Sequence, residues 1–155
     1  SVSIALRDSK ELLLGVVYEV TRDELYSAAK GQGAYLNDRA IKVSPLSDLD
    51  QALIMVGYPY NAEAWRDFCL KMTGQLYGHC ASIRSFGSAE TELCYLAAGK
   101  IDVYFESYIQ PWDVAAGACI LLEAGGKWER DHEVLATNGL LHDKMLAEME
   151  KACIN

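Results

Sequence analysis

Basic residues are scarce in this chain, which has 14 Lys and Arg against 22 Asp and Glu and a formal net charge of −8 over 155 residues. Nucleic-acid binding depends on clustered Lys and Arg that neutralise phosphates, so the acidic balance argues against a nucleic-acid partner. No apolar run approaches the roughly 18–20 residues of a membrane-spanning helix, and we expect no membrane association. Three prolines and twelve glycines are too few for a collagen-like or low-complexity chain.

Paired cysteines are also lacking. The five cysteines are odd in number and widely spaced, at Cys69, Cys80, Cys94, Cys119 and Cys153. There is no Cys-x-x-Cys, and no His lies at zinc-finger spacing from a Cys. We therefore expect free thiols that act as small buried apolar residues in a reducing cytoplasm.

The remaining composition is typical of a globular protein, with 51% apolar and 23% charged residues. A chain of 155 residues corresponds to one domain and can bury a hydrophobic core without disulfides. It opens at residues 1–6 on an alternating, strand-like run with no initiating Met and no polar leader. We therefore expect the functional unit to be longer than this sequence.

The first third of the chain predicts an antiparallel meander. Short apolar or alternating runs are separated by polar and glycine-containing turns, as in successive hairpins. The predicted strands cover residues 1–6, 12–20, 25–29, 34–36 and 41–43, the last two flanking a turn at Asn37 and Asp38.

The rest of the chain alternates between strands and helices, which favours a sheet covered by layers of helices. The predicted strands cover residues 52–56, 101–105 and 134–137, and residues 84–87 are expected to form a loop. The predicted helices cover residues 61–76 (capped by Asn61), 88–98, 111–124 and 140–151.

Pro111 indicates where one of these helices begins, because proline is favoured at the first helical position. Trp112 and Asp113 then lie in the first turn, where a carboxylate is favoured by the helix dipole and by free backbone N–H groups. An Asp in this position can project from the helix end and bind a hard cation such as Mg2+. The alternative is an ordinary first-turn Asp beside a Trp of the core.

Two further segments carry candidate functional groups. Gly87, Ser88 and Ala89 start a predicted helix, where backbone N–H groups can bind an anion or a substrate hydroxyl. Simple capping by Ser85 or Ser88 is the alternative. Glu106 ends an apolar strand, and ligand sites collect at strand ends in layered sheets; the alternative is a solvated loop acid. From the residues alone, these groups indicate a metal-assisted site for a polar ligand.

Several segments form an ordered pattern along the chain. The most specific is Pro111-Trp112-Asp113-Val114-Ala115-Ala116-Gly117, followed by Glu123-Ala124-Gly125-Gly126. Ahead of it stand Arg84, Gly87-Ser88-Ala89 and Ala97-Ala98-Gly99-Lys100-Ile101-Asp102, with Ala29-Lys30-Gly31-Gln32-Gly33-Ala34 near the start and Ala136-Thr137-Asn138-Gly139 near the end. This ordered set resembles the inositol monophosphatase family of metal-dependent sugar phosphatases.

The resemblance implies a mixed α/β (α+β) fold, the layered αβαβα sandwich that inositol monophosphatases share with fructose bisphosphatases. Residues 1–155 then form the C-terminal portion of a single domain whose N-terminal part is absent from this chain. The family's Asp-Pro-Leu/Ile-Asp-Gly-Thr motif and upstream Glu-Glu pair, which supply most metal ligands, do not occur here. We expect the isolated chain to be inactive, and to aggregate through a face that N-terminal helices would normally cover.

The resemblance also implies residue roles. Asp113 matches a metal-ligand aspartate that lies near the substrate ring, and Glu106 matches an acid that accepts a hydrogen bond from a sugar or inositol hydroxyl. The segment 87–89 matches a helix start that contacts substrate, and Arg84 matches a position that orients Glu106. The implied reaction is hydrolysis of a small-molecule phosphate monoester with Mg2+, most simply of inositol monophosphate or a related sugar phosphate, by a cytoplasmic homodimer.

Other functions stay open from the sequence. The missing metal motif motivates a non-catalytic, degenerate binding or regulatory module as the alternative from another class. Fructose bisphosphatase and 3′-nucleotide phosphatase are alternatives within the fold, although Glu106 ahead of a Pro-Trp-Asp segment favours the inositol branch. The charge of −8 does not oppose an anionic substrate, because bound Mg2+ would invert the local charge.

Overall fold

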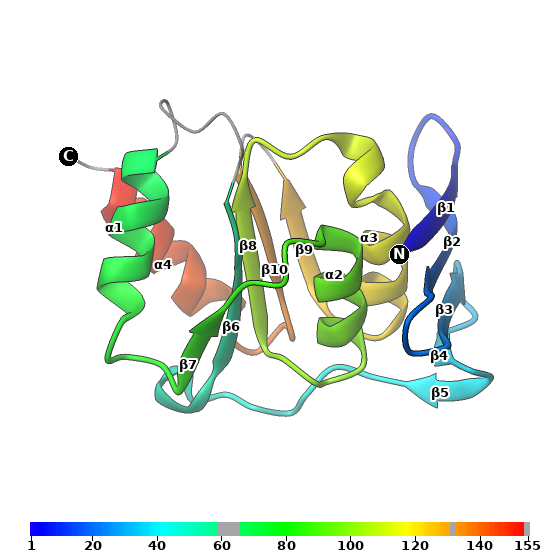
Figure 1. The fold of residues 1–155 in the computed structure, drawn as a ribbon, viewed down its shortest axis with the longest axis horizontal. Helices are drawn as coiled ribbons and strands as arrows, with labels where there is room; N and C mark the ends of the chain where they lie inside the picture. Colours follow the sequence, from blue (N-terminus) through cyan, green and yellow to red (C-terminus); the bar gives the residue numbers. More distant parts are fainter. Residues whose placement is uncertain (59–65, 131–132, 154–155) are drawn as a thin grey trace.

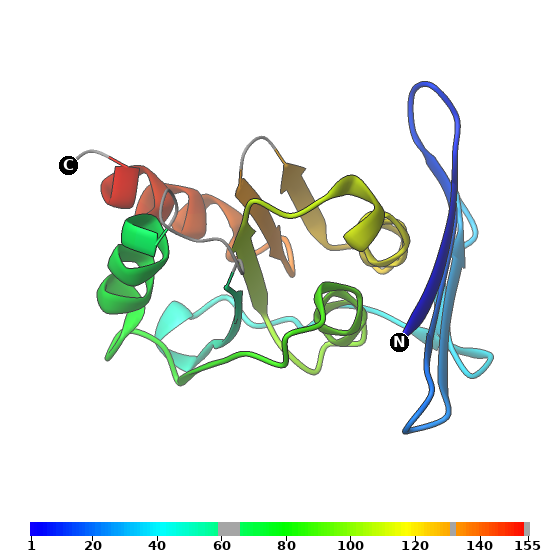
Figure 2. The same ribbon diagram turned by 45° about the horizontal axis from the view of Figure 1, so that its top comes forward.

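The computed structural model describes residues 1–58, 66–130 and 133–153. In this part of the chain, two five-stranded sheets and four α-helices stack in four layers. Figure 1 shows the order of the layers: a helix pair, a mixed sheet, a second helix pair and an antiparallel sheet. Figure 2 shows the same separation from another direction. The expected layered α/β architecture is therefore confirmed.

The antiparallel sheet, called the meander sheet below, follows chain order as the sequence predicts. Its strands are β1 (Val2–Arg7), β2 (Leu12–Glu19), β3 (Glu24–Ala29), β4 (Ala34–Leu36) and β5 (Arg39–Ile41). The predicted position of β5, at residues 41–43, is wrong by two residues. Asn37 and Asp38 both adopt positive φ angles, 45° and 64°, in a tight two-residue turn, so that Leu36 pairs with Arg39.

The second sheet, called the mixed sheet, has the strand order β7-β6-β8-β10-β9. Its strands are β6 (Leu53–Gly57), β7 (Ser82–Arg84), β8 (Val103–Ser107), β9 (Lys127–Arg130) and β10 (Glu133–Thr137), and η1 (Leu49–Gln51) is a short 3-10 helix before β6. β6 runs parallel to both β7 and β8, whereas β10 runs antiparallel to its two neighbours. The carboxyl ends of β6 and β8 therefore meet at one edge.

Neither edge strand of the mixed sheet is expected from the sequence. β7 has three residues and ends in Arg84, which the sequence assigns to a loop, and β9 reads Lys-Trp-Glu-Arg. Short, charged edge strands are a common way to prevent sheet-to-sheet pairing. β7 and β9 are too short and too polar to show a run of alternating apolar and polar residues, so the sequence pattern does not predict them as strands.

The helices cover both faces of the mixed sheet. The helices α2 (Ala89–Ala97) and α3 (Ala115–Glu123) lie between the two sheets, while α1 (Arg66–Leu76) and α4 (His142–Cys153) cover the opposite face (Figure 1). A hydrophobic core lies on each face of the mixed sheet. Because side chains alternate along a strand, adjacent residues of β8 belong to different cores. Tyr104 packs toward α2 and α3, and Phe105 packs toward α1 and α4. The predicted helix cap Asn61 lies outside the described residues.

The predicted single helix over residues 111–124 is wrong. Pro111–Asp113 forms a 3-10 turn (η2), and α3 begins only after Val114, whose φ of −141° interrupts the helix. Pro111 does stand at the start of the turn, as expected. Asp113 is thus placed on a separate turn ahead of α3 rather than within the first turn of a continuous α-helix.

The cysteines follow the expectation from the sequence only in part. Within the described residues, which include all five cysteines, no disulfide forms, and Cys69, Cys94 and Cys119 are buried as expected. Cys80 is half-buried and Cys153 is exposed, so the expected burial is wrong for Cys153. Within the described ranges, no helix is long and apolar enough to cross a membrane.

The meander sheet has one covered and one bare face. Its inner face packs on α3 at Gly15, where a Cβ would overlap the backbone carbonyl of Ala116. On the outer face, Val2, Ile4 and Leu6 of β1 are 56–64% exposed. Their cross-strand partners on β2 are the apolar Tyr18, Val16 and Leu14, which extend the same outer apolar face.

The outer apolar face should make the isolated 155-residue chain aggregate, because contiguous exposed apolar surface seeks a partner. Replacing Val2, Ile4 and Leu6 together by Thr keeps strand propensity while reducing apolar surface, and should raise the monomer fraction. Leu140→Thr, at a site that is 57% exposed elsewhere, is the matched control and should have little effect. Light scattering after size-exclusion chromatography measures both. A monodisperse, cooperatively unfolding parent chain would contradict this expectation.

Candidate functional site

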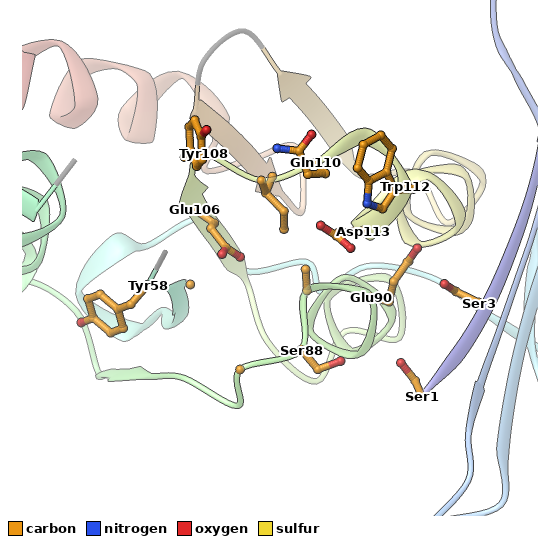
Figure 3. A pocket seen from close by; sticks show the side chains of 14 residues that line it. Ser1, Ser3, Tyr58, Ser88, Glu90, Glu106, Tyr108, Gln110, Trp112 and Asp113 are labelled. Atoms are coloured by element: carbon orange, nitrogen blue, oxygen red, sulfur yellow. The ribbon is translucent and has the colours of Figure 1, made fainter. Parts of the chain in front are cut away.

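A cavity of about 530 Å3 opens where β6 and β8 end and where α2 and η2 begin. The residues that line it are Ser1, Ser3, Gly57, Tyr58, Gly87, Ser88, Ala89, Glu90, Glu106, Tyr108, Ile109, Gln110, Trp112 and Asp113. The structure therefore brings together five of the six residues that the sequence singles out; Arg84 does not line the cavity. Figure 3 shows the carboxyl groups of Glu106, Asp113 and Glu90 directed toward a shared space.

Glu106 is held at the carboxyl end of β8 by its neighbours. Parallel pairing sets it opposite Gly57 at the end of β6. A Cβ on Gly57 would overlap the Glu106 carboxyl group, so a larger residue here would displace that group from its present position. The hydroxyl of Tyr104, two residues earlier on the same face, donates to Glu106 Oε2. Burial raises the pKa of Glu106, and the Tyr104 hydrogen bond partly opposes this rise.

Asp113 stands at the end of the η2 turn with an exposed side chain. Its backbone N–H donates to the Gln110 carbonyl at 3.0 Å, which closes the turn. The charge of Asp113 contributes to raising the pKa values of both Glu106 and Glu90. The carboxylate is therefore electrostatically coupled to the two other acids of the cavity while remaining accessible to a ligand.

Glu90 is a site residue that the sequence prediction misses. It is only 6% exposed, and its carboxyl group accepts the backbone N–H groups of Gly117 at 2.5 Å and Ala116 at 3.3 Å, at the start of α3. These N–H groups belong to the first helical turn, and the sequence analysis expects them to stabilise the Asp113 carboxylate instead. Burial raises the pKa of Glu90 to about 7, against the opposing effect of those two N–H groups.

A signal for Glu90 does exist in the sequence. Glu90 stands three, four and seven residues before the apolar Leu93, Cys94 and Ala97, which share its face of α2 and are buried in the structure. A carboxyl group on an apolar helical stripe needs a specific partner, because burying an unpaired charge is costly. The pattern could have indicated a buried, hydrogen-bonded acid, although not the helix it binds.

The segment 87–89 forms the opposite side of the cavity, at the start of α2. Gly87 has a φ of +74°, and Ser88 occupies the N-cap position. The Ser88 hydroxyl makes no capping hydrogen bond to the helix backbone and instead lies 3.0 Å from the Thr91 hydroxyl. The alternative in which Ser88 simply caps the helix is therefore wrong, and its hydroxyl lies in the wall of the cavity.

Arg84 ends β7 and points its guanidinium group to local backbone, donating to the Ile83 carbonyl at 2.8 Å. The side chain that donates a hydrogen bond to Glu106 within the described residues is Tyr104, not Arg84. An orienting role of Arg84 toward Glu106 stays a prediction.

Aromatic side chains surround the mouth of the cavity. Tyr58, Tyr108 and Trp112 are 50%, 60% and 71% exposed. The alternative that made Trp112 a core residue is therefore wrong. Sequence patterning offers no signal for Tyr58 and Tyr108, because both stand in connections without periodicity.

The cavity is strongly acidic. Its described lining includes three carboxyl groups and no Lys, Arg or His side chain. Oxygen-only donors suit a hard cation such as Mg2+. Nevertheless, among residues 1–58, 66–130 and 133–153 no three His, Cys, Asp or Glu side chains are placed to hold one ion. Asp113 fits as one ligand, and the described residues alone do not complete a metal centre.

Glu92 lies behind the cavity wall and is fully buried. Its Oε1 accepts the Phe86 N–H at 2.6 Å, while its Oε2 has no hydrogen-bond partner within the described residues. Burial is the largest cause that raises the pKa of Glu92 from 4.5 to about 7, and the charge of Glu106 adds to the rise. The folded protein therefore binds this proton more tightly than the unfolded chain does.

The stability of the full-length protein should consequently fall as pH rises. The contribution of Glu92 is fully present below pH 4.5 and is lost as pH rises through about 7. Glu92→Gln cannot ionise, so its stability should decline less over this window, by roughly 1–3 kcal/mol. Urea unfolding between pH 4.5 and 8 measures the difference. Glu150→Gln, at an exposed position of α4, should keep the parent profile; the same profile for Glu92→Gln would contradict the account.

Comparison with known proteins agrees with this geometry. A model of the inositol monophosphatase family matches residues 1–150. The Nus factor SuhB of Escherichia coli strain K12 is 40% identical over 126 residues, which cover 81% of this chain and 47% of that protein. The chain thus spans about half the length of this curated relative.

Solved structures give the same result. The extragenic suppressor protein suhB from Bartonella henselae superposes with a TM-score of 0.90 at 32% identity, covering 96% of this chain and 60% of that one. Inositol monophosphatase from Anabaena superposes with a TM-score of 0.87 at 35% identity, covering 96% and 63%. The chain belongs to the inositol monophosphatase family.

Proposed function

We propose that the protein containing this chain is a Mg2+-dependent phosphatase that hydrolyses inositol monophosphate or a related sugar phosphate. The observation that carries the proposal is the cavity in which Glu90, Glu106 and Asp113 converge without a cationic side chain among the described residues. A phosphate ester is an anion and would be repelled by such a cavity. A divalent cation bound at Asp113 removes that repulsion and makes an acidic cavity suitable for an anionic substrate.

The chain's own residues then divide into two tasks. Asp113 supplies an accessible carboxylate to the cation, and Glu90 keeps the first N–H groups of α3 occupied so that the turn before α3 stays in place. Mg2+, when bound, supplies activation of a water molecule and stabilisation of the leaving oxygen. The Ser88 hydroxyl and the start of α2 contact the substrate from the opposite side of the cavity.

Glu106 supports the preference for a polyol. A carboxylate accepts several hydrogen bonds, so it can hold neighbouring hydroxyl groups of an inositol or sugar ring. Gly57 and Tyr104 fix its position at the strand end, which makes the acceptor directional rather than mobile. We carry over the cytoplasmic location and the homodimer from the family as part of the proposal.

A non-catalytic binding module is the alternative. The Escherichia coli relative is named a Nus factor rather than a phosphatase, and this name supports a binding role. The accessible carboxylate of Asp113 supports hydrolysis instead. Fructose 1,6-bisphosphate and 3′-nucleotides are the alternative substrates within the fold.

Replacing Asp113 by Asn tests the proposal in the full-length protein. The substitution removes a charged cation ligand, so phosphate release from inositol 1-phosphate with Mg2+ should fall by two or more orders of magnitude. Asp143→Asn, at an exposed position of α4, is the matched control and should keep parent turnover. The rate of phosphate release is the measurement.

Two outcomes of this assay would contradict parts of the proposal. Unchanged turnover of Asp113→Asn would show that the Asp113 carboxylate is not a cation ligand needed for hydrolysis. Parent protein that releases no phosphate from any of the inositol, fructose and nucleotide esters with Mg2+ would favour the binding module. A strong preference for fructose 1,6-bisphosphate would overturn the choice of substrate.

A further inference from the structure

Tyr108 has an unusual backbone conformation. Four non-glycine residues in the described part of the chain have positive φ angles: Asp23, Asn37, Asp38 and Tyr108. The first three carry short polar side chains, which commonly adopt the left-handed region in tight turns. Tyr108, with a φ of +60°, is the one bulky side chain among them. This conformation carries a cost for a residue with a large Cβ substituent.

The contacts of the Tyr108 side chain do not offset the energetic cost of its positive φ. The side chain is 60% exposed, so burial in a core does not hold it in place. No hydrogen bond of its hydroxyl is recorded within residues 1–58, 66–130 and 133–153. A glycine at this position would avoid the strain altogether. Residues held in strained backbone conformations concentrate at active sites and ligand-binding sites.

The location of Tyr108 points to such a site. It stands two residues after Glu106, at the mouth of the acidic cavity, and lines that cavity together with Trp112. Figure 3 shows Tyr108, Gln110 and Trp112 along one side of the cavity, beside Glu106 and Asp113. The positive φ sets where the chain leaves β8 and therefore where the aromatic ring stands relative to the carboxyl groups.

This arrangement combines two kinds of recognition. The carboxyl group of Glu106 accepts hydrogen bonds from hydroxyl groups, whereas an exposed aromatic face packs against the C–H face of a ring. A cyclic polyol or sugar presents both surfaces on one rigid molecule. An acyclic polyol offers hydroxyl groups but no fixed apolar face, and it loses more conformational freedom on binding.

We propose that Tyr108 is a specificity-determining residue that makes the enzyme prefer phosphate esters of cyclic alcohols over those of acyclic alcohols. Its ring packs against the face of the substrate ring while Glu106 accepts the hydroxyl groups. The inference rests on the proposed phosphatase function and adds the basis of substrate selection to it.

The test compares two substrates with the full-length protein and Mg2+. Inositol 1-phosphate is the cyclic ester and glycerol 2-phosphate the acyclic one, and the measurement is the ratio of their kcat/KM values. Tyr108→Ala should lower this ratio about threefold to tenfold, mostly through KM of the cyclic ester. Tyr108→Phe should keep the ratio, because the ring and not the hydroxyl makes the contact. Tyr77→Ala, 81% exposed and outside the cavity lining, is the matched control.

Tyr108→Gly separates substrate selection from a structural role. Removing the side chain relieves the positive-φ strain, so the melting temperature should rise by a few degrees, while the kcat/KM ratio should fall as in Tyr108→Ala. A merely structural residue would not combine higher stability with lost selectivity.

The outcomes distinguish this inference from the proposed function. A parent enzyme that hydrolyses both esters, with a ratio unchanged by Tyr108→Ala, would overturn the role of Tyr108 and leave the phosphatase intact. An equal fall for both esters would also overturn it. Parent protein without Mg2+-dependent hydrolysis of either ester would overturn both proposals together.

Discussion

The hydrogen bonds of Glu90 join the two helices on which the cavity is built. The side chain leaves the first turn of α2, and its carboxyl group accepts the N–H groups of Ala116 and Gly117 at the start of α3. The segment 87–89 leads into the first residue of α2, and Asp113 precedes α3. One buried carboxyl group therefore links the two sides of the site. Without this connection, the start of α3, which follows the η2 turn, would lose its hydrogen bonds to α2.

Burial of carboxyl groups produces the electrostatics of the site. Glu90, Glu106 and the fully buried Glu92 all have raised pKa values, and burial is the largest cause in each case. Acidic groups placed so close to one another are costly unless they serve a ligand of opposite charge. The net charge of −8, which at first only argues against nucleic acid, thus agrees with a cavity whose positive charge comes from a bound cation.

The sequence predicts the parts of this protein that depend on periodic patterns and on ordered motifs. The meander sheet, the alternation of strands and helices, and the convergence of Glu106, Asp113 and the segment 87–89 follow from such patterns. The short edge strands β7 and β9 do not, because charged edges carry no apolar period. The role of Glu90 likewise depends on contacts between α2 and α3, which only the tertiary structure brings together. The break at Val114 has no signal in the apolar pattern of residues 111–124.

A crystal structure of the full-length protein soaked with Mn2+, whose anomalous scattering locates the ion, tests the cation site most directly. We predict an ion bound by the Asp113 carboxylate, inside the cavity that Glu90 and Glu106 share. Ions found only outside this cavity, with Asp113 left uncoordinated at a Mn2+ concentration that supports phosphate release, would contradict the central claim.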